Sequence, residues 1–171
     1  MKKLTADQLS ELLFEQFVLE DEVNVQTKDL GPYIINTYSQ NLIFKKHVFF
    51  YLCSLIAVAL TEEFEIKEGI ADVIYGFRQR VLNEALKRWN MFQAEADNVI
   101  EEASAVLGKL LFVNPKSNCA VSFEWARDYF GQTMIDEMNP ITLFKISTFW
   151  KTRYLAVAQL LRAVEVVLDK N

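Results

Sequence analysis

The chain has 171 residues, a length that predicts one domain, residues 1–171, with a substantial core. Hydrophobic residues make up 51% of the sequence, aromatic residues 13% and charged residues 24%, a balance that excludes a disordered chain. The formal net charge is −5 and the sequence pI is near 5.0, which disfavours nucleic-acid phosphates and anionic membranes as general partners.

The composition also favours helices. Five glycines and three prolines leave little material for the many tight turns of a β-sandwich. The N-terminus begins with two lysines, but acidic residues and glutamine interrupt it before a secretory apolar core can form. We therefore expect an all-α protein with a cytoplasmic location.

The first helix is expected to begin after Thr5. The Thr5 hydroxyl can accept from the free amides of the first turn while Gln8 reaches back, which is the spacing of a capping box. Leu9, Leu13 and similar residues then form one apolar stripe. Beyond it the helix becomes acidic, ending in Glu20, Asp21 and Glu22, and we expect these acids to be solvated.

A second helix can begin at Pro32, because proline fits the first turn of a helix. It could continue to Glu63, but the polar residues 36–41 suggest a kink or a break. The sequence leaves open whether residues 32–63 form one helix or two.

The run from Val48 to Leu60 is almost wholly apolar and contains no charged residue. A membrane-spanning helix needs roughly 20 apolar residues. Charged residues end this run on both sides before that length is reached. A helix that is apolar all round must be covered on all sides. We therefore predict no membrane span, but a buried helix at the centre of the fold.

His47, Ser54 and Thr61 recur every seven residues and so share one side of this central helix. This side could simply be the one nearest to solvent. Alternatively, the imidazole and the two hydroxyls could line a ligand pocket or contribute to a partner surface. We treat the three residues as candidate binding residues.

Further helices are expected over Ile70–Trp89, which has a clear one-sided apolar pattern, and over Phe92–Val113 and Ser122–Glu137. Asn139 and Pro140 are typical of a helix start, and this last helix should run to about Leu168. Trp150 and Arg153 lie on its wide apolar face. The Arg153 guanidinium must reach the edge of that face, pair with a carboxylate, or bind an anion.

Several kinds of chemistry are disfavoured. The chain has one histidine, so neither a di-iron carboxylate centre nor a zinc site can be assembled from the usual ligands. It has no glycine-rich phosphate loop and no GxSxG nucleophile elbow. Cys53 and Cys119 are expected to be reduced thiols. We predict no metal, no cofactor and no enzymatic activity.

The sequence thus predicts a single compact bundle of about six helices around the central one. We expect a protein that binds another protein, as an adaptor, inhibitor or dedicated chaperone does, or that self-associates as a homodimer. Alternatively, it could be a sensor or carrier of an apolar small molecule held between helices, for which a cavity of about 300 Å³ or more is expected. Arg153, His47, Ser54, Thr61 and Trp150 are the candidate ligand- or partner-binding residues.

Overall fold

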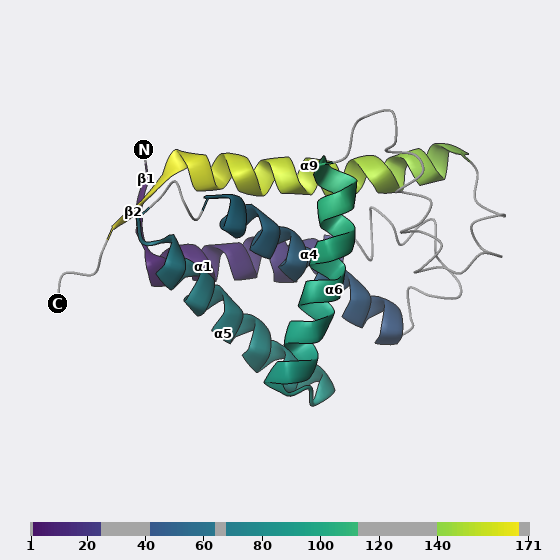
Figure 1. Ribbon diagram of the computed structural model, residues 1–171, viewed down its shortest axis with the longest axis horizontal. Helices are drawn as coiled ribbons and strands as arrows, with labels where there is room; N and C mark the ends of the chain where they lie inside the picture. The colour runs from purple at the N-terminus through teal and green to yellow at the C-terminus, as the bar shows by residue number, and fades with distance from the viewer. Residues whose placement is uncertain (1, 25–41, 64–67, 113–139, 168–171) are drawn as a thin grey trace.

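The computed structural model describes residues 2–24, 42–63, 68–112 and 140–167 (Figure 1). This part of the chain is mostly helical, which confirms the predicted helical bundle, and it also carries one small pair of parallel strands that was not predicted. Residues 32–41 of the segment expected to begin a helix at Pro32, the helix expected over residues 122–137, and Cys119 lie outside the described residues.

The central helix is α4 (Leu42–Glu63). Every residue from Val48 to Ile56 is buried, and so are Ala59 and Leu60. Helices α5, α6 and α9 and the N-terminal helical run all contact α4. The prediction of a buried central helix is therefore confirmed. Burial on all sides explains why α4 lacks a polar face over the nine residues from Val48 to Ile56, because none of them is exposed to water.

The chain begins with strand β1 (Lys2–Thr5), followed by α1 (Ala6–Phe14), the π-helical turn η1 (Glu15–Glu20) and α2 (Asp21–Asn24). The expected capping box is present. The Thr5 hydroxyl accepts from the Gln8 amide at 3.2 Å, and the Gln8 side chain accepts from the Thr5 amide at 3.1 Å. The run buries Leu9, Leu13 and Val18 against the core.

Helix α5 (Ile70–Trp89) matches the predicted range, and α6 (Gln93–Phe112) lies within one residue of it at each end. The buried residues of α5 recur every four positions at Val73, Phe77, Val81 and Ala85. Asn90 then adopts a left-handed conformation with φ of 54° and reverses the chain. From this turn α5 and α6 diverge as a V (Figure 1).

Helices α1 and α5 cross closely at Gly76. A Cβ atom at this position would lie 2.8 Å from the Ser10 Oγ atom. The Ser10 hydroxyl donates to the Asp7 carbonyl at 2.9 Å and accepts from Arg80 Nε at 3.4 Å. The absence of a side chain at Gly76 thus lets the two helices approach at this point.

Helix α9 (Pro140–Ala163) begins at the predicted proline, but the prediction that it continues to about Leu168 is wrong. Residues Val164–Val167 form strand β2 instead, which pairs in parallel with β1, with Lys2 beside Val164 and Thr5 beside Val167. Three of the four residues of β2 are valines, whose branched side chains suit an extended backbone. Two distant ends of the described chain therefore meet in one sheet (Figure 1).

Candidate functional site

The structure separates the three residues predicted to share one side of α4. Ser54 is fully buried, and its hydroxyl lies within hydrogen-bonding distance of the Phe50 carbonyl, at 2.7 Å, and of the Ile100 carbonyl on α6, at 3.2 Å. Thr61 is exposed and donates to the Ala57 carbonyl at 2.8 Å. His47 belongs to α4, but its side chain lies outside the described residues. Of the three, Thr61 lines a pocket, while Ser54 holds α4 against α6.

The two candidate residues of α9 lie in intramolecular contacts. The Arg153 Nε atom is 3.0 Å from Asp21 Oδ2, and both side chains are largely buried. The Trp150 side chain is fully buried, and its ring centroid lies 5.5 Å from that of Tyr51 on α4. Arg153 thus joins α9 to α2 by an ion pair, one of the alternatives expected for it.

At the acidic end of the N-terminal helical run, Glu20 is exposed as expected, but Asp21 and Glu22 are largely buried. The Glu22 side chain is only 7% exposed, and its carboxylate lies 2.6 Å from Arg88 Nη1. Arg88 also pairs with Glu84 at 2.6 Å, and its guanidinium lies 5.3 Å from the Phe49 ring centroid. Burial would raise the pKa of Glu84, but hydrogen bonds and charge from Arg88 and Lys87 outweigh it, so the pKa falls below its usual value.

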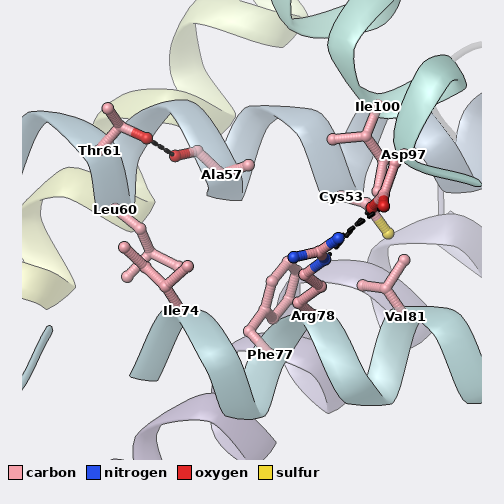
Figure 2. Close-up of a pocket in the computed structure, with 10 residues that line it drawn as sticks. All are labelled: Cys53, Ala57, Leu60, Thr61, Ile74, Phe77, Arg78, Val81, Asp97 and Ile100. Carbon is pink, nitrogen blue, oxygen red and sulfur yellow. Dashed lines mark hydrogen bonds and ion pairs between the residues drawn. The ribbon is translucent and has the colours of Figure 1, made fainter. Parts of the chain in front are cut away.

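A pocket of about 190 Å³ lies between α4, α5 and α6, where the V of α5 and α6 opens (Figure 2). We call it the α4–α6 pocket. Its lining is mainly apolar. The apolar lining residues are Cys53, Ala57, Leu60, Ile74, Phe77, Val81 and Ile100, and the polar ones are Thr61, Arg78 and Asp97.

The charged part of the α4–α6 pocket is one ion pair from α5 to α6 (Figure 2). Arg78 binds the Asp97 carboxylate through two bonds, Nε to Oδ1 at 3.2 Å and Nη2 to Oδ2 at 2.5 Å. The side chains are 46% and 35% exposed, so the pair lies on the solvent side of the pocket. On the inner side, burial raises the pKa of the Cys53 thiol well above its usual value, and the charge of Glu22 adds to this rise. The thiol is therefore neutral.

A second feature is the turn between α5 and α6, which we call the α5–α6 corner and define by Leu86, Trp89 and Phe92. Leu86 is 47% exposed and Phe92 66% exposed, while Trp89 is partly buried against the core. The corner projects away from α9 and the strand pair (Figure 1). Large apolar side chains at a projecting turn are available for contact with another molecule.

Of the candidate residues predicted from the sequence, Thr61 lines the α4–α6 pocket. Arg78 and Asp97, which also line it, are not among the candidate binding residues predicted from the sequence. Their pairing depends on the angle between α5 and α6, which periodicity does not give. The sequence carries only a weak signal for this pair, namely that a basic and an acidic residue lie on consecutive helices joined by a short turn.

The fold and these two features define a helical bundle with a small apolar pocket and an apolar corner. Comparison of the chain with known protein families, curated proteins and solved structures gives no match. None of the described helices combines the length and hydropathy that crossing a membrane requires. Within the same residues, no three or more His, Cys, Asp or Glu side chains are grouped so that they could hold a metal ion.

Proposed function

We propose that the protein is a non-catalytic interaction module of the cytoplasm that binds another protein through the α5–α6 corner. The observation that carries this proposal is the exposure of Leu86 and Phe92 on either side of one turn. A few residues, among which aromatic side chains are enriched, supply most of the binding energy at protein interfaces, and burying any large apolar side chain removes apolar area from water.

The corner is also held in one conformation, which supports the proposal. The Asn90 amide donates to the Leu86 carbonyl at 2.9 Å, and the Met91 amide to the Ala85 carbonyl at 3.4 Å. The Phe92 amide donates to the Glu95 side chain at 3.1 Å, which caps the start of α6. A surface that is already ordered loses little conformational entropy when a partner binds, so more of the contact energy appears as affinity.

Photo-crosslinking tests the proposal. The crosslinking residue p-benzoylphenylalanine replaces Phe92 in one variant and Leu155 in a control, in cells that make the full chain. Leu155 lies on α9, away from the corner, and is 48% exposed, close to the 47% of Leu86, so it is a comparably accessible apolar position. We expect a discrete crosslinked protein from position 92 that is absent from position 155.

Adding Leu86→Ser should remove that product, whereas adding Leu155→Ser should leave it. Loss of a central contact residue costs about 2 kcal/mol or more, which is roughly a 30-fold weaker Kd. Equal crosslinking from positions 92 and 155 would overturn the proposal. A product that is a second copy of the chain would also contradict it, and would assign the corner to a homodimer.

A further inference from the structure

We infer that the α4–α6 pocket is a binding site for an uncharged, mainly apolar small molecule. Its volume of about 190 Å³ limits the size of the ligand. An engineered apolar cavity of about 150 Å³ is large enough to bind benzene. The pocket is smaller than the 300 Å³ expected for a carrier of larger molecules, so it suits a ligand with about the volume of a six-carbon chain or a single aromatic ring.

The lining determines where a polar group of the ligand could lie. The inner walls are formed by buried apolar side chains, including Leu60, Phe77 and Val81. At one edge, Thr61 already donates its hydroxyl proton to the Ala57 carbonyl. The Thr61 oxygen can therefore still accept a hydrogen bond, for which a ligand hydroxyl is a suitable donor.

The charges of the lining determine the net charge of the ligand. The Arg78 cation is matched by the Asp97 anion, and the buried Cys53 thiol is neutral, so the lining has no net charge. A charged ligand would lose hydration on entering and would meet no unmatched counter-charge. The ion pair thus selects for uncharged molecules, and this selection does not depend on the proposed protein partner, because no residue of the α5–α6 corner lines the pocket.

A matched pair of probes tests the site. We propose titrating the purified full chain at pH 7 with 1-hexanol and, separately, with hexanoate, which share an apolar chain and differ in charge. Amide shifts in heteronuclear NMR spectra report binding. We expect saturable shifts around Cys53, Ala57 and Ile100 with hexanol, and at least tenfold weaker binding of hexanoate. Absence of saturable shifts with hexanol, or equal affinity for the two probes, would overturn the inference.

Two variants locate the binding. Ala57→Leu places additional side-chain volume in the pocket and should abolish hexanol binding. Ala156→Leu makes the same change on the exposed surface of α9 and should leave binding unchanged. Hexanol binding that survives Ala57→Leu in a folded variant would exclude this pocket as the site.

Asp97→Asn tests the role of the ion pair and does not alter the buried walls. It removes the anion that matches Arg78, so the lining gains a net positive charge. We expect the preference to reverse, with hexanoate binding at least as tightly as hexanol. If Asp97→Asn leaves the preference for hexanol unchanged, the ion pair does not select the ligand and that part of the inference is wrong.

Discussion

At the scale of single residues, the charges next to the core are matched by opposite charges from other segments. Arg153 of α9 meets Asp21, and Arg88 of α5 meets Glu22, so two neighbouring acids hold the short helix α2 against two different helices. Both acids are largely buried. Removing one partner of such a pair costs more than an exposed ion pair contributes, because the remaining charge keeps its desolvation penalty.

A double-mutant cycle on Arg153 and Asp21 measures this coupling. We expect Arg153→Met and Asp21→Asn each to lower the free energy of unfolding by about 1–3 kcal/mol, since each leaves the other charge in a largely buried place. The double variant should lose less than the sum, with a coupling of roughly 0.5–3 kcal/mol. Urea denaturation of the four proteins gives these values. Additive losses would show that the pair does not stabilise the fold.

The prediction that Asp21 and Glu22 are solvated is wrong, and the cause is a local feature of the backbone. The pattern was interpreted as regular α-helix, but η1 precedes Asp21 and Glu22. A π-helical turn contains more residues than an α-helical turn, so it changes the direction in which the following side chains point. Side chains assigned to the outside by α-helical periodicity can therefore face the core, as Glu22 does.

At the scale of elements, the sequence predicts helices with strong periodicity and misses short strands. Helix α5 was predicted to the residue, because a long one-sided apolar pattern defines its range. Strand β2 was missed because four residues are too few for a period to be recognised. The apolar pattern of α9 continues into β2, and its partner β1 lies at the other end of the described chain.

The crossing of α1 and α5 gives a prediction for Gly76→Ala. At an exposed position inside a helix, replacing glycine by alanine would stabilise the folded protein by about 1 kcal/mol. Here the new Cβ would meet Ser10, and overpacking costs about 1–3 kcal/mol, so we expect a net loss of stability. Thermal or urea unfolding measures the effect.

Ser10→Ala provides the control for this crossing. It removes the oxygen at 2.8 Å from the new Cβ but keeps the Ser10 Cβ at 3.2 Å, so Gly76→Ala should cost clearly less stability in that background. A clear gain in stability from Gly76→Ala alone would show that the two helices can separate at little cost.

At the scale of the whole molecule, the sequence predicts the buried central helix and the helical class, because both follow from composition and apolar patterns. It does not predict the α4–α6 pocket, which results from the angle between α5 and α6. That angle is set by contacts between distant residues, such as Ser54 with the Ile100 carbonyl and Arg78 with Asp97. Pattern analysis of a single sequence does not determine which of these distant residues meet.

The strand pair gives a prediction at this scale. Deleting residues 1–4 removes most of β1 but keeps Thr5, the cap of α1. We expect a loss of roughly 1–3 kcal/mol from the ladder hydrogen bonds and the partly buried Leu4, and a Tm lower by several degrees. Hydrogen exchange should also become faster at Val164–Val167.

The double variant Lys2→Ala and Lys3→Ala is the control, because it keeps the backbone ladder and removes exposed charges. The Lys3–Glu165 contact is 3.5 Å long between exposed groups, so its loss should have little effect. Unchanged exchange at Val164–Val167 after the deletion would show that β1 does not protect β2.

The order of synthesis also determines when β1 can pair with β2. A ribosome makes Lys2–Thr5 before α4, α5, α6 and α9, and their partner strand emerges only after these helices have been made. During translation the first strand therefore has an open edge, which other chains could pair with. Because contacts so distant in sequence form slowly, closure of this sheet should be a late event in folding, after the helices have packed around α4.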